Sequence, residues 1–289
     1  MSLKSDLRQD FVYQTQYVPE RVTQYFDTVG IQEWYRLLEN PTKEVALHVH
    51  THYLKKFVDP GDRVLEVGAG AGRFTQILAQ LGARIVASDL SPVQLSLNKQ
   101  QADEYGYTAS IEAWEQMDMC DMSRLPDDSF DCVVAYGGPF SYVLDQRDIA
   151  LAECLRVLRP GGLLILSVIS LWGSTHRNLD RLLEIAPSIN QQIVSTGDIL
   201  PGMIADYEQS FHMFRASELR EWLEQAGLQV LAISASDCLA SCRVGDASKI
   251  RSDLEKWNEL LRMEVEACAE QESWNMGMHT IAVAWKQPE

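Results

Sequence analysis

Long apolar runs are missing from this sequence. No stretch of the 289 residues approaches the roughly 20 consecutive apolar residues that a membrane-spanning helix requires. The first ten residues, MSLKSDLRQD, contain no apolar core of the kind that a secretory signal carries. We therefore expect a cytoplasmic protein that has no membrane partner.

Positive charge is also scarce. The chain has 25 lysines and arginines against 41 aspartates and glutamates, which gives a formal net charge of −16, and no basic cluster offsets this excess. A surface of this charge repels the phosphate backbone of DNA and RNA. We expect no nucleic-acid partner, although the charge does not choose among small-molecule substrates.

The sequence has few pairs of residues at the spacings typical of metal ligands. The six cysteines include no Cys-x-x-Cys pair, and most stand inside apolar or helical runs, which favours reduced thiols in a core. Cys238 and Cys242 could meet on one helical turn, and His48 and His52 on another, but neither pair has a further ligand nearby in sequence. We expect no metal site.

From residue 63 onward, strand-like apolar runs alternate with helical ones. The pattern predicts strands over 63–67, 84–88, 110–118, 130–136 and 162–170, with helices over 71–81, 92–106 and 146–158 between them. The runs DCVVAY and LLILSVI are continuously apolar, which is typical of strands buried on both faces. This alternation predicts an α/β fold, a doubly wound and mostly parallel sheet with helices on both faces.

Less regular segments flank this core. We divide the chain into N-terminal helices (1–58), the core (59–170), an inserted segment (171–213) and a C-terminal part of the core (214–289). The last part contains a long helical pattern before the final strand, with one apolar stripe that includes Leu254 and Trp257. The stripe packs on its own domain or forms a dimer seam, so we expect a monomer or a homodimer.

A glycine-rich turn and a carboxylate mark the first crossover, RVLEVGAGAGRFTQILAQLGARIVASDLSP. Glycines at 68, 70 and 72 leave no Cβ to block a ligand, and the helix that follows presents unpaired backbone N–H groups. Asp89 ends the next strand, where a carboxylate can accept hydrogen bonds from two vicinal ribose hydroxyls. The combination predicts a ligand that contains adenosine.

Two positions separate the candidate ligands. The third glycine of a dinucleotide-binding Gly-x-Gly-x-x-Gly would fall at position 73, which is Arg73. Glu66 would repel a diphosphate, whereas it would attract an ammonium group. S-adenosylmethionine carries adenosine and an ammonium group but no phosphate, so the loop favours it over a nicotinamide dinucleotide.

The crossover resembles the first two motifs of the class I, Rossmann-like S-adenosylmethionine-dependent methyltransferases, in particular their small-molecule type. Three further segments resemble later motifs of that family: CDMSRLPDDSFDCVVA, LAECLRVLRPGGLLIL and FRASELREWLEQAGLQVL. The resemblance implies a seven-stranded sheet under a lid formed by the N-terminal helices and the insertion. It also implies methyl transfer to a small-molecule acceptor by in-line displacement, which leaves S-adenosylhomocysteine. The alternatives are a non-catalytic protein that binds either nucleoside and, third, an NAD(P)-dependent oxidoreductase.

The resemblance assigns cofactor contacts to the glycine turn and the strand after it. Gly68, Ala69 and Gly70 are expected along the methionine moiety of the donor. Glu66 is expected to orient its amino group, and Asp89 to hold the ribose hydroxyls.

Further contacts are implied on the adenine side. Leu90 is expected against the adenine, with Gln94 nearby. Asp121 is expected to accept from the adenine amino group and the Met122 backbone N–H to read a ring nitrogen, with Asp118 as a rival for the acidic role.

The end of the fourth strand and the insertion complete the expected site. Tyr136 and Gly137 are expected to offer backbone carbonyls to the ligand's ammonium group. His212, which follows the insertion, is the candidate catalytic base. Aromatic residues are the candidates for the lid and for the walls of the methyl-transfer cavity: Tyr25, Trp34, Tyr35, Phe140 and Tyr142.

Overall fold

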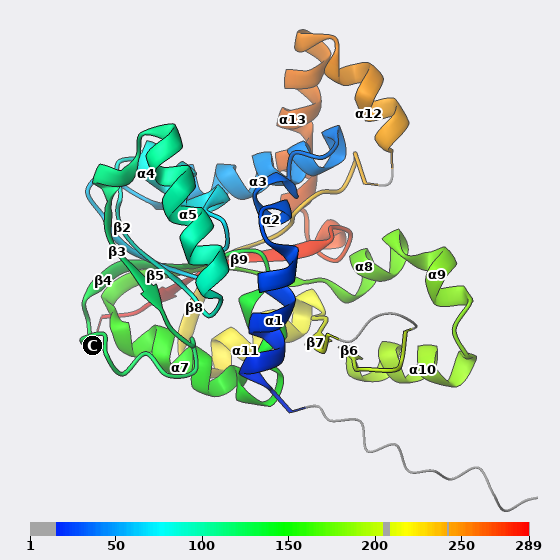
Figure 1. The fold of residues 1–289 in the computed structure, drawn as a ribbon. Helices are drawn as coiled ribbons and strands as arrows, with labels where there is room; N and C mark the ends of the chain where they lie inside the picture. The colour runs from blue at the N-terminus through cyan, green and yellow to red at the C-terminus, as the bar shows by residue number, and fades with distance from the viewer. Residues whose placement is uncertain (1–15, 205–208, 242, 289) are drawn as a thin grey trace, which may run out of the picture.

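A seven-stranded sheet forms the centre of the structure, a computed structural model that describes residues 16–204, 209–241 and 243–288. The strand order is β3-β2-β1-β4-β5-β9-β8 (Figure 1). The strands are β1 (Arg63–Val67), β2 (Arg84–Asp89), β3 (Ile111–Gln116), β4 (Phe130–Ala135), β5 (Leu158–Ile169), β8 (Leu228–Ala235) and β9 (His279–Lys286). Strand β9 pairs antiparallel with β5 and β8, and the other pairs are parallel. The predicted mostly parallel, seven-stranded sheet is confirmed.

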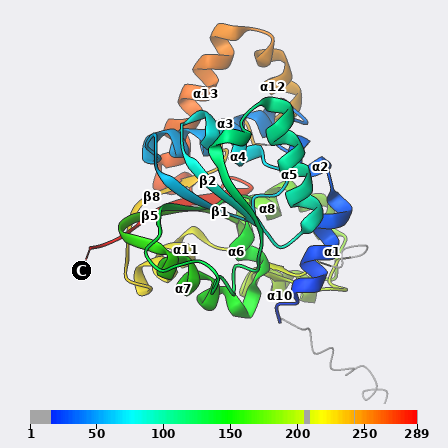
Figure 2. The same cartoon turned by 60° about the vertical axis from the view of Figure 1, so that its left-hand side comes forward.

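Successive residues of the central strands face opposite helical layers. On β1, Val64 packs into a cluster with α3 (Pro41–Phe57), α4 (Arg73–Gln80) and α13 (Leu254–Ala269). Leu65 packs into a second cluster with α7 (Arg147–Val157) and α11 (Ala216–Gln225). Helix α5 (Pro92–Tyr105) lies beside α4, as both views show (Figure 2). Because both faces are covered, the inner strands are apolar at consecutive positions.

The strand order reverses beside β1. The chain passes from β1 to β2 and β3 and then returns to form β4 on the other side of β1. The carboxyl ends of β1, β2 and β4 therefore surround one point, which is where open α/β sheets bind ligands.

Helical segments from two parts of the chain cover this edge. The N-terminal part supplies α1 (Pro19–Val29) and α2 (Gln32–Tyr35), and Figure 1 shows α1 in front of the sheet with the insertion beside it. The insertion has its own apolar cluster, which includes Leu182, Ile193 and Met213. Its elements are α8 (Leu171–Arg177), α9 (Leu179–Leu183), α10 (Pro187–Thr196), β6 (Asp198–Ile199) and β7 (Phe211–His212). None of the helices that the structure describes is both long and apolar enough to span a bilayer.

Two helical segments are interrupted by a change in backbone conformation, and a single helix was expected for the C-terminal one. The long C-terminal pattern divides into α12 (Val244–Arg251) and α13, because Asp253 is extended and its side chain caps α13 by accepting from the Lys256 backbone N–H. The N-terminal pattern divides into α1 and α2 at Gly30, whose φ is +53°. Within the predicted stripe Trp257 is buried, whereas Leu254 is 70% exposed.

Candidate functional site

The glycine turn after β1 forms a cradle that has no room for side chains. Gly68 has a φ of +66°, and a Cβ on it would lie 2.6 Å from the Cγ of Pro139, at the start of α6 (Pro139–Tyr142). A Cβ on Gly70, with a φ of +53°, would lie 3.2 Å from the Cγ of Glu33. Both positions need glycine for backbone conformation and for close approach.

Asp89 closes this cradle from β2. Its Oδ2 accepts from the Gly70 backbone N–H at 2.8 Å, and its Oδ1 accepts from the Ser91 backbone N–H at 2.8 Å. Burial raises the pKa of Asp89 to about 6, although these backbone donors oppose the shift. The glycine turn and the aspartate, 19 positions apart in sequence, are thus brought together as predicted.

Two cavities meet at the cradle. The smaller, which we call the loop cavity, has a volume of about 90 Å³ and is lined chiefly by residues at the strand ends: Gly68, Gly70, Asp89, Leu90, Met117, Met119, Tyr136 and Gly137. The larger, which we call the lid cavity, has a volume of about 390 Å³ and lies between the N-terminal helices, the insertion and the start of β9. Both are lined by Phe26, Glu33, Gly137 and Tyr142, so these residues stand at their junction.

Hydrogen bonds hold the N-terminal helices onto the cradle. The Gln94 side chain donates to the carbonyl oxygens of Phe26 at 2.8 Å and Gly30 at 3.0 Å. The Arg73 guanidinium donates to the Trp34 carbonyl and stacks 3.8 Å from the centre of its ring. Trp34 is buried. The N-terminal helices therefore cover the cradle and are held to the two helices that follow β1 and β2.

The charge of the loop cavity restricts its ligand. Among the described residues that line it, Glu33 and Asp89 are acidic, and none is a lysine, arginine or histidine. A diphosphate would meet only negative side chains there, whereas a cationic nucleoside would be attracted.

Comparison with known proteins agrees with this geometry. A family model described as a methyltransferase domain matches residues 65–166. The ubiquinone/menaquinone biosynthesis C-methyltransferase UbiE of Teredinibacter turnerae is 34% identical over 112 residues, 37% of this chain and 43% of that protein. The UbiE of Hahella chejuensis is 27% identical over 196 residues, 64% of this chain and 70% of that protein. Residues 65–166 therefore match a methyltransferase domain, and the chain is similar to class I S-adenosylmethionine-dependent methyltransferases.

Solved structures share the fold of this chain. The [4+2]-cyclase SpnF superimposes with a TM-score of 0.62 at 19% identity, covering 95% of this chain and 98% of that one. A Haemonchus contortus phosphoethanolamine N-methyltransferase superimposes with a TM-score of 0.56 at 17% identity, covering 94% of this chain and 59% of that one. The curated sequence relatives match over less of their length, in the Teredinibacter protein under half.

S-adenosylmethionine, the donor of this family, matches the chemistry of the loop cavity on two observations. Asp89 presents a carboxylate at the cradle, and basic side chains are absent from the described lining of the cavity. Six of the residues that the sequence assigned to the donor line this cavity and are the ones that would hold it: Gly68, Gly70, Asp89, Leu90, Tyr136 and Gly137. Met117 and Met119 join them, and the apolar residues of MDMCDM at alternate positions were the sequence signal that could have identified them.

Glu66, Ala69 and Gln94 support the cradle from behind. Glu66 is buried and accepts from the Thr75 hydroxyl at 2.6 Å, and burial raises its pKa to about 8. The Ala69 backbone N–H donates to the Ser88 carbonyl, and the Gln94 side chain holds the lid. None of these three residues lines the loop cavity.

Asp121 and Met122 lie apart from the loop cavity, in contrast to the sequence expectation. Asp121 is exposed to solvent and accepts from the Ser123 backbone N–H. The Met122 backbone N–H donates to the Glu153 carboxylate at 2.8 Å, so it is occupied by an α7 side chain. The rival residue Asp118 accepts from the Cys120 backbone N–H and does not line the cavity either. The turn after β3 directs Met117 and Met119, and neither of its carboxylates, toward the site.

His212 also lies outside both cavities. Its Nδ1 is 2.7 Å from Asp198 Oδ1 and its Nε2 is 2.9 Å from Glu218 Oε1, so carboxylates occupy both ring nitrogens. Burial opposes the imidazolium, but these carboxylates outweigh it and raise the pKa of His212. The ring therefore links β7 to β6 and α11 rather than facing an acceptor, which differs from the role expected from the sequence.

His279 is the histidine that lines the lid cavity, and the sequence analysis missed it. It begins β9, and because β9 runs antiparallel, its first residue lies at the carboxyl edge of the parallel strands, opposite Ile169 at the end of β5. Burial and the charges of Arg36 and Arg177 lower the pKa of His279 well below its ordinary value, so the ring is neutral. An antiparallel last strand that opens with histidine was the available signal.

Cys238 lines a third, open cavity at the surface with His176, and Cys242 lies outside the described residues. Within the described part of the chain, no three histidine, cysteine or acidic side chains converge as metal ligands would.

Proposed function

We propose that this methyltransferase transfers the methyl group of S-adenosylmethionine to a small-molecule acceptor that binds in the lid cavity. The observation that carries the proposal is the junction of two cavities of different character, an acidic one at the glycine cradle and a larger one under the lid. When bound, the donor supplies a methyl group that is already activated by its sulfonium, so the protein needs chiefly to align the acceptor and exclude water.

Residues at the junction perform the alignment. The rings of Phe26 and Tyr142 meet edge to face, with centroids 5.4 Å apart, and line both cavities. Aromatic rings attract a sulfonium and shield the transferred methyl group from water. His279 lines the lid cavity, and its neutral imidazole can accept a hydrogen bond from a hydroxyl or amine acceptor and so orient it toward the methyl group. We propose a cytoplasmic enzyme that acts as a monomer or a homodimer and takes no nucleic-acid substrate.

The donor assignment is tested by calorimetric titration. S-adenosylhomocysteine is expected to bind the wild-type protein, whereas NAD and NADP give no heat. Asp89→Asn is expected to weaken this binding at least about tenfold, because a charge-assisted hydrogen bond to ribose is lost. Asp128→Asn, a surface carboxylate that is 54% exposed, is the matched control and should bind as the wild type does. Binding of the dinucleotides alone would overturn the assignment.

A protein that binds the nucleoside without transferring its methyl group is the second candidate. The fold does not distinguish the two candidates, because it also occurs in a protein of different chemistry, a [4+2]-cyclase. The two are separated by incubating the protein with S-adenosylmethionine and pools of small-molecule acceptors. Release of S-adenosylhomocysteine that depends on an acceptor supports the enzyme. Tight binding without release from any pool supports the second candidate.

A further inference from the structure

The lid cavity concentrates positive charge in an acidic protein. Its described lining includes four cationic side chains, Arg36, Lys43, Arg177 and Arg181, against two acidic ones, Glu33 and Asp237. The chain as a whole carries a net charge of −16. Lys43 also pairs with Glu39, which does not line the cavity. The positive character of the cavity therefore depends on its three arginines, whose guanidinium groups have more donors than one carboxylate partner can occupy.

Arg36 is charged and faces this cavity. It follows α2, and its Nε donates to Glu33 Oε1 at 2.8 Å. Burial opposes the charge, but the Glu33 carboxylate outweighs it and raises the pKa of Arg36. Although protein surrounds the guanidinium, 30% of the side chain remains accessible. Because Arg36 lines the lid cavity, this accessible area is available to a ligand there.

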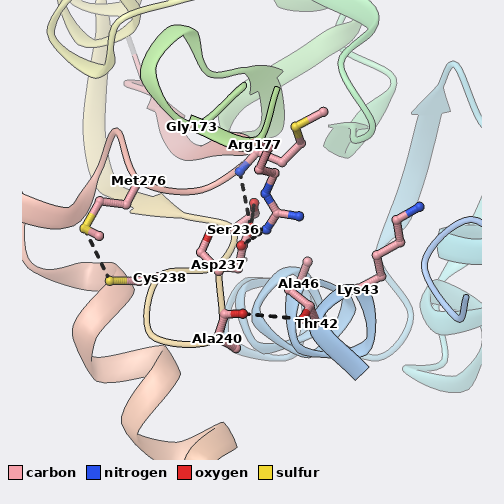
Figure 3. Close-up of polar contacts among 12 residues, drawn as sticks. Thr42, Lys43, Ala46, Gly173, Arg177, Ser236, Asp237, Cys238, Ala240 and Met276 are labelled. Atoms are coloured by element: carbon pink, nitrogen blue, oxygen red, sulfur yellow. Dashed lines mark hydrogen bonds and ion pairs between the residues drawn. The ribbon is translucent and has the colours of Figure 1, made fainter. Parts of the chain in front are cut away.

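Arg177 reaches the opposite wall from α8. Its guanidinium pairs with Asp237, in the segment after β8, and Figure 3 shows the two side chains meeting, with Lys43 projecting from α3. The Asp237 side chain is fully buried and also accepts from the Ser236 hydroxyl at 2.9 Å. Such buried pairs contribute little net stability, since desolvation offsets the attraction. Asp237 instead fixes the position of a guanidinium that lines the cavity.

We propose that the lid cavity recognises an acceptor that carries a carboxylate or phosphate group on an apolar body, with Arg36, Arg177 and Arg181 binding the anionic group. This inference rests on the proposed function and adds the class of its substrate. Guanidinium groups match the planar, bidentate geometry of carboxylate and phosphate oxygens. Phe26, Tyr142 and Phe211, which also line the cavity, provide apolar surface for the rest of the molecule.

The two cavities then have opposite charge preferences. The loop cavity is acidic and suits the cationic donor, whereas the lid cavity is basic and suits an anionic acceptor. Glu33 and Arg36 form an ion pair at the boundary, with the acidic member shared by both cavities and the basic member on the acceptor side. Each ligand is therefore attracted to its own cavity and to the other ligand, and exchange of the two is disfavoured.

The test uses the full chain saturated with S-adenosylhomocysteine, in a buffer free of phosphate and carboxylates. Benzoate and phenyl phosphate are titrated by calorimetry beside the neutral probes benzamide and benzyl alcohol. At least one anion is expected to bind about tenfold or more tightly than its neutral counterpart, because a charge-assisted hydrogen bond adds that much affinity. Whichever of benzoate and phenyl phosphate binds more tightly identifies the anionic group as a carboxylate or a phosphate.

Variants assign the binding to this cavity. Arg181→Gln is expected to reduce anion affinity about tenfold, and the double variant Arg177→Gln/Asp237→Asn to reduce it at least as much without leaving a buried charge unpaired. The control is Arg262→Gln, a residue of α13 whose side chain is 55% exposed, which should leave the affinity for the anions unchanged. The proposal is overturned if the anions bind no better than the neutral probes while S-adenosylhomocysteine still binds. If that nucleoside itself fails to bind, the proposed function fails instead.

Discussion

Replacing Glu66 by glutamine should stabilise the ligand-free protein and weaken its function. Burial raises the pKa of Glu66 from an ordinary 4.5 to about 8. In the unfolded chain Glu66 ionises above pH 4.5, whereas in the folded protein it stays protonated up to about pH 8. The free energy of unfolding therefore falls as pH rises from 4.5 toward 8. The loss in free energy of unfolding amounts to about 5 kcal/mol over the full interval, of which about 3 kcal/mol is already lost at pH 7. Glu66→Gln keeps the hydrogen bond to Thr75 and removes this loss.

The assay is urea unfolding of both proteins at pH 5 and pH 7. The free energy of unfolding of Glu66→Gln minus that of the wild type is expected to grow by about 2 kcal/mol between these conditions. Glu115→Gln, a strand residue that is 38% exposed, serves as the control and should give a constant difference. A difference for Glu66→Gln that does not change with pH would refute the burial argument.

The same variant reports on the ligand. Glu66 lies behind the cradle, and an ammonium group bound in the loop cavity would favour its carboxylate form through the electrostatic field rather than by contact. S-adenosylhomocysteine binding to the wild type is therefore expected to release a proton near pH 7. Glu66→Gln should bind more weakly and release none. Calorimetry in two buffers of different ionisation enthalpy measures the proton count. Equal counts in both proteins would mean that Glu66 stays protonated in the complex.

Three further substitutions test the cradle, the lid and the insertion. Gly68→Ala should lower S-adenosylhomocysteine affinity at least about tenfold, because the added Cβ would clash with the ring of Pro139. The control in the same titration is Gly227→Ala, which has a φ of +84° but no neighbouring atoms, so it tests backbone strain alone. Trp34→Ala removes the stacking on Arg73, so the dissociation rate of S-adenosylhomocysteine, measured by stopped flow, should rise about tenfold or more. An unchanged rate would mean that other contacts hold the N-terminal helices. His212→Gln should retain turnover yet lose about 1–2 kcal/mol of stability below the raised pKa of His212, a loss that should shrink as pH rises through that pKa in urea unfolding.

The fold was readable from the sequence because its signals are local. Strands buried on both faces, such as Phe130–Ala135, are continuously apolar, and glycines mark the turns between elements. The predicted bounds of the strand at residues 63–67 agree with the structure. The helix break at Asp253 was missed because a capping aspartate resembles any other polar residue inside an amphipathic pattern.

The donor side of the site was partly readable for the same reason. Gly68, Gly70 and Asp89 stand at strand ends, so sheet topology alone places them together. The turn after β3 has no such rule, and a shift of a few residues decides whether Asp121 or Met117 faces the cavity.

The acceptor side was not readable, because its defining charges are dispersed in sequence. Arg36 comes from the N-terminal lid and Arg177 from the insertion, while the carboxylate that positions Arg177 comes from the segment after β8. A net charge of −16 conceals the local excess, since composition averages over surfaces that the fold separates. In the proposed function, the charges that the N-terminal helices and the insertion bring to the sheet edge select the acceptor, while the cradle beneath them selects the donor.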